Sequence, residues 1–264
     1  MKLSVLCENT TVNDTFGAEH GLSLYLETQA HRILFDMGQT DLFLQNARKM
    51  GVDLSQADMA VLSHGHYDHG GGIHAFLQLN PTAPVYLHQN AFDAHYHGIH
   101  KYIGLDQTLA DHPRLVRTQG TLTLAKGVTL YSCNHYALSH PISSSGLNVR
   151  TGTAMLPETF LHEQYLLIEE NNRRILISGC SHKGILNIAG WFRPDILIGG
   201  FHLMNLDPTI DGDREQLSRT AHTLLQYPTR YYTGHCTGSG QYDFLKERMG
   251  ERLEAIHAGT VLTL

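Results

Sequence analysis

The chain has 264 residues, of which 42% are hydrophobic and 17% charged, and its net charge is −6 with neutral histidines. It has no cluster of Lys and Arg and no apolar run near the roughly 20 residues that span a bilayer, so we expect neither nucleic acid nor a membrane as a partner. The first residues lack a signal-peptide core and the four scattered cysteines show no disulfide pattern, so we expect a cytoplasmic protein with reduced thiols.

Short apolar runs bounded by Gly, Ser or Thr predict buried strands. In chain order these runs are 22–26, 32–36, 58–63, 85–88, 128–133, 165–169, 174–178, 195–200 and 230–234. Helices are predicted over 41–50, ended by Gly51, and over 215–227, ended by Pro228, with residues 211–214 as a turn before the second helix. The alternation of strands and helices predicts a layered fold of the α/β class.

Histidine is unusually frequent, with 19 residues, as many as Lys and Arg together. Four of the predicted strands run into a histidine, directly or within a few residues, and these histidines are His64, His182, His202 and His235. Because α/β folds place ligands at the carboxyl ends of buried strands, we expect these side chains to line one site.

The densest group of polar residues is His64-Gly65-His66-Tyr67-Asp68-His69, directly after a predicted strand and before three glycines. We expect a loop here, because residues two apart on a helix point in different directions. Glycines allow such a loop to turn tightly and bring the side chains to one side. His64 and His66 can then hold one metal ion, and Asp68 and His69 a second ion about 3.5–4 Å away.

These residues resemble the signature of the metallo-β-lactamase fold superfamily, and the likeness extends along the whole chain. Within it, the chain is similar to a branch typified by the dihydropterin-aminobenzene ribofuranosyl phosphate synthases. The segments that carry the resemblance are 33–38, 62–69, 179–185, 199–203 and 233–238. The resemblance implies one domain over residues 1–264, built as a four-layer αββα sandwich with two metal ions at one edge.

The resemblance implies one further metal ligand directly, and at two other positions the chain departs from the superfamily. His235 matches the final histidine of the superfamily, and Cys180 stands where most members have a bridging aspartate, with His182 as a further ligand two residues later. The usual third histidine has no clear counterpart; His135 and His140 lie in the expected interval. Asp36 is a candidate for orienting a metal-binding histidine through a hydrogen bond.

A second group of histidines, at positions 88, 95, 97 and 100, follows the strand predicted over 85–88. Its members either line the substrate cleft or lie on a surface helix or loop.

The sequence therefore predicts a metal-dependent hydrolase of a small metabolite, with two zinc ions, or Mn²⁺ or Fe²⁺ in their place. A metal-activated hydroxide would attack a phosphoester, thioester or lactone, oriented by Asp68, while His202 and His182 stabilise the charge that develops. The branch resemblance implies an alternative, a transferase that joins a pterin-type group to a phosphoribosyl-aminobenzene acceptor. An iron-dependent redox or sensing protein is a weaker alternative, and the ligand set argues against β-lactam hydrolysis. The sequence leaves the substrate and the oligomeric state open.

Overall fold

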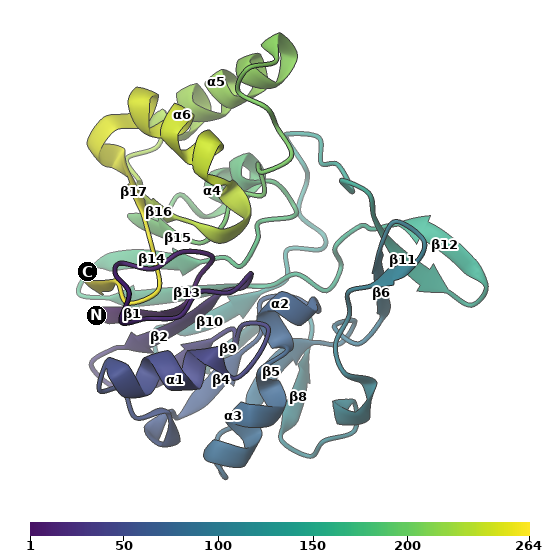
Figure 1. The fold of residues 1–264 in the computed structure, drawn as a ribbon, viewed down its shortest axis with the longest axis vertical. Coiled ribbons are helices and arrows are strands. Elements are labelled where there is room, and N and C mark those ends of the chain that lie inside the picture. The colour runs from purple at the N-terminus through teal and green to yellow at the C-terminus, as the bar shows by residue number, and fades with distance from the viewer.

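The computed structural model describes residues 1–264 as two seven-stranded sheets packed face to face, each with helices on its outer side. Figure 1 shows the N-terminal half of the chain in one sheet and its helices, and the C-terminal half in the other, with the two termini side by side. Four layers thus run in the order helix, sheet, sheet, helix. This confirms the α/β class and the αββα sandwich expected from the sequence.

The first sheet is mixed. Its first four strands in spatial order pair antiparallel, and the strands after them are parallel to one another. In spatial order the strands are β18 (Val261–Thr263), β1 (Lys2–Cys7), β2 (Ser23–Glu27), β3 (Arg32–Phe35), β4 (Met59–Val61), β5 (Val85–His88) and β8 (Leu115–Thr118).

The second sheet has parallel strands at one side and antiparallel strands at the other. Its β13–β14 hairpin turns at Asn171 and Asn172, which both adopt positive φ angles as this two-residue turn requires. In spatial order its strands are β17 (Leu253–Ala255), β16 (Arg230–Thr233), β15 (Ile196–Ile198), β14 (Arg173–Ile177), β13 (Tyr165–Glu170), β10 (Val128–Tyr131) and β9 (Thr121–Ala125).

Three apolar cores hold the layers together. One lies between the two sheets and includes Val5, Phe35 and Ile177. The second packs the outer face of the first sheet against α1 (Leu42–Lys49) and α3 (Ile73–Leu79). The third packs the second sheet against α4 (Ile185–Phe192), α5 (Asp211–Leu225) and α6 (Ser239–Met249). None of the helices combines the length and the apolar character that crossing a bilayer requires.

A small third sheet projects from one side of the sandwich, and no prediction from the sequence anticipated it. It consists of β12 (Ala154–Pro157), β11 (Leu147–Thr151), β6 (Ala94–His97) and β7 (Lys101–Tyr102). Of the second group of histidines, His95 is buried in β6, His88 is buried at the end of β5, and His97 and His100 are exposed. The surface helix considered for this group is therefore wrong, because the segment pairs with β11.

Two local predictions are also wrong. Residues 67–70 form a short helix, α2 (Tyr67–Gly70), within the segment expected to be a loop. His64 and His66 precede this helix and lie in non-helical backbone. The expectation of a loop is therefore correct for these two residues and wrong for Asp68 and His69. Helix α5 begins at Asp211, not at residue 215, because Asp211 and Asp213 occupy its first turn, where carboxylates favour a helix.

Candidate metal centre

The segments that follow β4, β14, β15 and β16 meet at one edge of the sandwich. Together with the exposed His20, which precedes β2, they carry four groups of His, Cys and Asp side chains whose donor atoms, within each group, lie within 4.8 Å of one another; all members except His20 are buried. The groups are His64/His66/His182, His64/His69/Cys180, Cys180/His235/Cys236 and His20/Asp68/His235. Every ligand named from the sequence therefore lies at this edge, whereas neither His135 nor His140 joins a group. His135 is exposed and His140 is half-buried.

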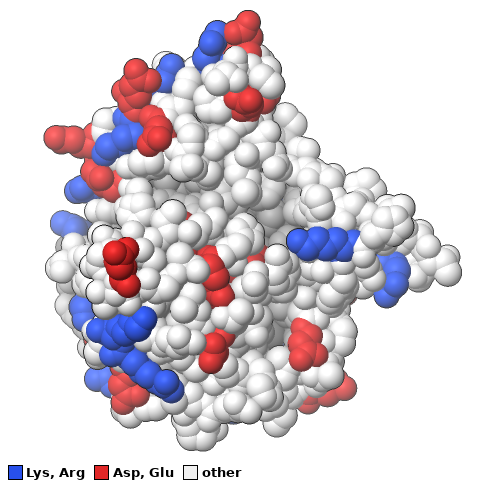
Figure 2. Space-filling view, viewed as in Figure 1, with Lys and Arg blue, Asp and Glu red and all other residues white.

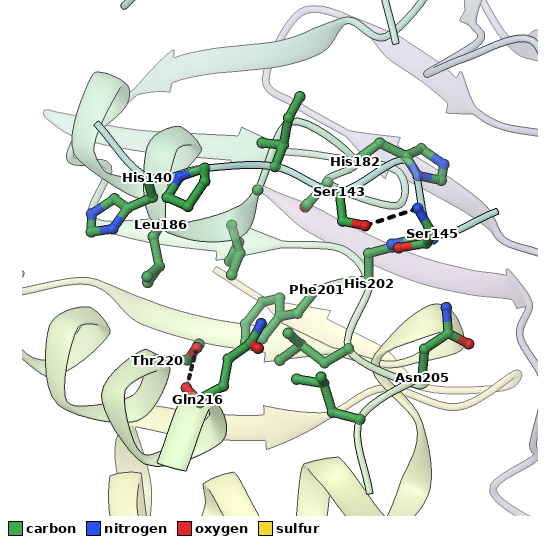
Figure 3. A pocket seen from close by; sticks show the side chains of 17 residues that line it. His140, Ser143, Ser145, His182, Leu186, Phe201, His202, Asn205, Gln216 and Thr220 are labelled. Atoms are coloured by element: carbon green, nitrogen blue, oxygen red, sulfur yellow. Dashed lines mark hydrogen bonds between the residues drawn. The ribbon is translucent and has the colours of Figure 1, made fainter. Parts of the chain in front are cut away.

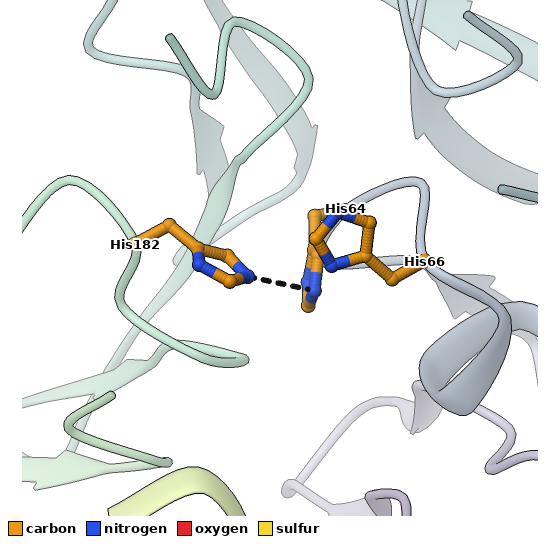
Figure 4. A group of neighbouring side chains, drawn as sticks. All are labelled: His64, His66 and His182. Carbon is orange, nitrogen blue, oxygen red and sulfur yellow. Dashed lines mark hydrogen bonds between the residues drawn. The ribbon is translucent and has the colours of Figure 1, made fainter. Parts of the chain in front are cut away.

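The first group contains His64, His66 and His182, drawn in Figure 4. His182 reaches across from the second half of the chain and places its Nε2 atom 3.3 Å from Nε2 of His64. All three side chains are buried, and burial lowers the pKa of each, in the case of His66 to about 3. Neutral imidazoles present lone pairs, which a metal ion requires.

Members of the other three groups form a second possible metal site, made of Asp68, His69, Cys180 and His235. Nε2 of His69 lies 3.1 Å from Sγ of Cys180 and 3.1 Å from Nε2 of His235. Oδ2 of Asp68 lies 3.3 Å from Nε2 of His235 and 3.7 Å from Nε2 of His69. A tetrahedral zinc ion with bonds of about 2.0–2.3 Å has ligand-to-ligand distances of about 3.3–3.7 Å. These four distances, from 3.1 to 3.7 Å, lie in or close to this range, so the donors have the spacing that a zinc-sized ion requires.

The hydrogen bonds behind His69 and His235 show which nitrogen faces the site. Nδ1 of His69 lies 2.7 Å from a carboxylate oxygen of Asp36, and Nδ1 of His235 lies 2.9 Å from Oδ1 of Asn9. Both partners are acceptors, so each Nδ1 carries a hydrogen, and in the neutral rings each Nε2 presents a lone pair. Two lone pairs 3.1 Å apart repel each other unless a proton or a cation lies between them. The residues present therefore fit a metal ion.

His64 has the same orientation. Its Nδ1 atom lies 2.8 Å from the hydroxyl of Ser63, which donates its own hydrogen to Asp36. The hydroxyl oxygen therefore accepts from His64, whose Nε2 is left bare. Asp36 also accepts the backbone N–H of Ser63, so one buried carboxylate orients two of the imidazoles in the manner expected of ligand-positioning residues.

The charges at the site respond to one another. Burial would lower the pKa of His69, but the carboxylates of Asp36 and Asp68 outweigh it and raise that pKa to about 9. Burial would raise the pKa of Asp68, yet the neighbouring imidazoles of His69, His20 and His235 hold it well below its usual range. Burial raises the pKa of the Cys180 thiol, and Cys236 adds to the effect. The donor set thus carries an ionised carboxylate and a thiol that a metal ion would deprotonate.

Two glycines allow the segments to approach this closely. A Cβ atom on Gly65 would lie 2.1 Å from the carbonyl oxygen of Ala91, and one on Gly179 would lie 2.2 Å from the hydroxyl of Ser63. Gly179 directly precedes Cys180 and its neighbour Ser63 directly precedes His64. The absence of a side chain at position 179 therefore lets the two halves of the site meet.

Two cavities open beside the metal-binding groups. The larger, of about 570 Å³, is drawn in Figure 3, and the smaller, of about 260 Å³, lies against Asp68 and His235. His182 and His202 line both cavities. Burial, with a contribution from His235, lowers the pKa of His202 to about 4, so its ring is neutral at pH 7. His202 therefore lies beside the metal-binding groups. The sequence analysis predicted a catalytic role for this residue.

The sequence did not identify His20 and His162 as members of the site, and it named His95 only as one of four histidines that either line the substrate cleft or lie on the surface. Nε2 of His20 lies 3.3 Å from Asp68, and His66, His95 and His162 form a further group of close ring nitrogens. His20 lies in an irregular segment, so no periodic signal could mark it. His162 precedes β13 in a stretch whose polar side chains are all buried, and this burial is visible only in the fold.

Comparison with known proteins gives consistent results. The model of the metallo-beta-lactamase superfamily matches residues 16–147. The 7,8-dihydropterin-6-methyl-4-(beta-D-ribofuranosyl)-aminobenzene-5'-phosphate synthase of Methanocaldococcus jannaschii is 27% identical over 290 residues, covering 99% of this chain and 96% of its own. A second, uncharacterized protein of that organism is 29% identical, covering 89% and 90% of the two chains. The crystal structure of Tm1679, a metal-dependent hydrolase of the beta-lactamase superfamily, superposes with a TM-score of 0.83 at 28% identity, covering 100% and 99% of the two chains.

Proposed function

This chain belongs to the metallo-beta-lactamase superfamily and is an enzyme of that superfamily. We propose that it is a hydrolase that uses two metal ions to cleave an ester-type bond of a small molecule. His64, His66 and His182 hold one ion. Asp68, His69, Cys180 and His235 hold the other. The bond cleaved is a phosphoester, a thioester or a lactone.

The observation that carries this proposal is the pair of facing Nε2 atoms of His69 and His235, 3.1 Å apart with Cys180 and Asp68 beside them. A set of imidazoles, one thiolate and one carboxylate suits zinc, because sulfur ligands favour zinc over Mg²⁺ or Ca²⁺. Zinc is therefore the metal that we propose, and manganese and iron are the alternatives to be separated by metal analysis.

When bound, the two ions would supply Lewis acidity and a water molecule of lowered pKa. The chain's own residues supply the proton transfers. Asp68 lines the smaller cavity and is ionised, so its carboxylate orients an attacking water and accepts its proton. His202 is neutral and lines both cavities, so it donates a hydrogen bond to the oxygen on which negative charge develops.

The walls of the cavities support a small organic substrate with an anionic group. Cavities of about 300–1,000 Å³ are typical of small-molecule sites. Phe201 and Leu186, labelled in Figure 3, are among the apolar residues of the larger cavity, which has no Asp, Glu, Lys or Arg in its wall. Lys101 lines the smaller cavity beside the metal-binding groups. On the face drawn in Figure 2, most charged side chains lie away from the central hollow.

A second candidate function is a group transfer, which the synthase of Methanocaldococcus jannaschii favours because it matches nearly the whole chain. In that reaction a pterin-type group would be joined to a phosphoribosyl-aminobenzene acceptor. Two organic substrates need two compartments, and the two cavities share Ser145, His182, His202 and Asn205 as a common wall.

The test combines metal analysis with turnover. We expect purified protein loaded with zinc to hold two equivalents and to hydrolyse members of a panel of chromogenic phosphodiesters, thioesters and lactones. His66→Ala and Asp68→Ala should each lose about one metal equivalent together with turnover, whereas His135→Ala, at an exposed position outside the cluster, should leave both unchanged. Full activity in a variant that has lost its metal would overturn the mechanism. Turnover that appears only with a second organic substrate would favour the transferase.

A further inference from the structure

Two further buried histidines, His95 and His162, lie next to His66 on the side away from the other metal-binding residues. The ring centroids of His95 and His162 are 4.0 Å apart, and they lie 5.6 Å and 5.1 Å from that of His66. A ring nitrogen of each residue lies within 4.8 Å of one in each of the others. In all three, Nε2 is buried without a hydrogen-bond partner. Buried polar atoms usually have partners, so this group needs an explanation.

The hydrogen on His162 is located by the backbone. The N–H group of Gly65 donates to Nδ1 of His162 at 2.8 Å. A ring nitrogen that accepts a hydrogen bond bears no hydrogen, so the hydrogen of the His162 ring is on Nε2. His162 therefore offers a donor to the group and no lone pair, and it is not a metal ligand.

The hydrogen on His95 is located by a carboxylate. Nδ1 of His95 lies 2.8 Å from Oε2 of Glu158, whose other oxygen accepts the N–H groups of Thr159 and Phe160. The carboxylate accepts and does not donate, so Nδ1 of His95 carries the hydrogen and Nε2 of the neutral ring presents a lone pair. Of the three unpartnered Nε2 atoms, this one is the acceptor.

We propose that His95 and Glu158 are positioning residues that orient His66 for metal binding through a two-step chain of hydrogen bonds. In this arrangement Nε2–H of His66, which has no partner in the structure, would donate to Nε2 of His95 once the two rings move closer, and Nδ1–H of His95 donates to Glu158. This leaves Nδ1 of His66 bare toward His64 and His182. On the other side of the site, the carboxylate of Asp36 contacts His69 directly. Here the carboxylate of Glu158 acts on His66 in the same way, but through the imidazole of His95. This inference rests on the proposed function, because it takes His66 as a metal ligand.

Glu158→Gln is a sharp test because it reverses the direction of the hydrogen bond between residue 158 and His95 with almost no change in side-chain shape. The amide oxygen must face the N–H groups of Thr159 and Phe160, so the amide nitrogen faces Nδ1 of His95. His95 then has to accept at Nδ1 and carry its hydrogen on Nε2, where it opposes the hydrogen of His66. We expect zinc affinity about 10–100-fold weaker, the range typical for loss of a ligand-positioning contact.

His95→Phe removes the acceptor while filling the space, and we expect the same loss of zinc affinity. His95→Gln retains an acceptor near the place of Nε2 and should recover most of it. His100→Phe, at an exposed position beyond β6, is the matched control and should bind zinc as the unchanged protein does. Affinities are measured by competition with a chromophoric zinc chelator.

Nitrogen-15 spectra of the histidine rings in the metal-free protein give a reading independent of metal. The expected pattern is hydrogen on Nδ1 of His95 and on Nε2 of His162. The opposite tautomer of His95 overturns the inference, as does unchanged zinc affinity in both His95→Phe and Glu158→Gln. A third metal equivalent that is lost with His162→Phe also overturns it. If the unchanged protein binds no metal, the proposed function fails, while the tautomers still decide whether the chain of hydrogen bonds exists.

Discussion

Nε2 of His69 lies 3.1 Å from Sγ of Cys180, although 111 residues separate the two in the sequence. His69 belongs to α2, which follows β4 of the first sheet, and Cys180 follows β14 of the second sheet. The contact therefore joins the two halves of the sandwich. A metal ion bound there would link the halves and stabilise the folded chain over the unfolded one.

Cys180 and Cys236 differ in their relation to the imidazoles, which gives a spectroscopic prediction. Both thiols are buried, but only Cys180 lies within hydrogen-bond distance of His69, while Cys236 donates to the carbonyl oxygen of Cys180. We expect the cobalt-loaded protein to show a thiolate-to-metal charge-transfer band. Cys180→Ser should lose this band and Cys236→Ser should keep it. A band that depends on Cys236 alone would show that the wrong thiol has been assigned.

His182 provides a prediction about the number of bound metal ions. Its Nε2 atom faces that of His64, so His182→Ala removes one of three donors from the first group. We expect the variant to retain about one zinc equivalent where the unchanged protein holds two, as read by plasma mass spectrometry after gel filtration. His140→Ala serves as the comparison and should hold two. If His140→Ala lost an equivalent and His182→Ala did not, the assignment of the third histidine would be reversed.

The stability of the metal-free protein should depend on pH in a defined direction. Burial lowers the pKa of His66 to about 3 and that of His202 to about 4, whereas the unfolded chain has histidine pKa values near 6.5. Below about pH 6.5 these two histidines therefore bind protons in the unfolded chain but stay neutral in the folded chain. The free energy of unfolding should fall as the pH drops, by about 1.4 kcal/mol per pH unit for each such histidine.

His69 acts in the opposite direction, because its pKa is raised to about 9. Its contribution to stability is fully present below about pH 6.5 and is lost as the pH rises through 9. Urea unfolding of the metal-free protein between pH 6.5 and 5.0 isolates the lowered histidines, since the His69 contribution is constant there. Stability that is flat or rises on acidification in this range would contradict the prediction.

Gly65 should be intolerant of any side chain. A Cβ atom there meets the carbonyl oxygen of Ala91 at 2.1 Å, so Gly65→Ala must displace backbone between His64 and His66. We expect a loss of about 1–3 kcal/mol of stability, the usual cost of overpacking, together with weaker metal binding. Gly240→Ala lies in α6 with no atom within 4 Å of the new methyl group, and should stabilise the protein by about 0.5–1 kcal/mol. Thermal unfolding compares the two; equal effects would refute the steric argument.

Much of the architecture could be predicted from the sequence because it depends on local signals. Residues 175–177 and Ile196–Ile198, within the predicted runs, are apolar without interruption, which is what a strand buried on both faces requires; the first lie in β14 and the second form β15. Asn171 and Asn172 form the turn between β13 and β14 with positive φ angles, which asparagine tolerates. The small third sheet was missed because its strands are short and half-exposed, and carry no clear alternation.

For the site, the sequence alone determined which residue types follow which strands, since strand, turn and histidine are neighbours in the chain: His64, His182, His202 and His235 were found in this way. Only the tertiary structure decided which of them meet, that His182 rather than His140 faces His64, and that His95 and Glu158 lie behind His66. The physical reason is that hydrogen-bond partners and donor groups are set by the packing of two sheets, which brings together residues more than 100 positions apart.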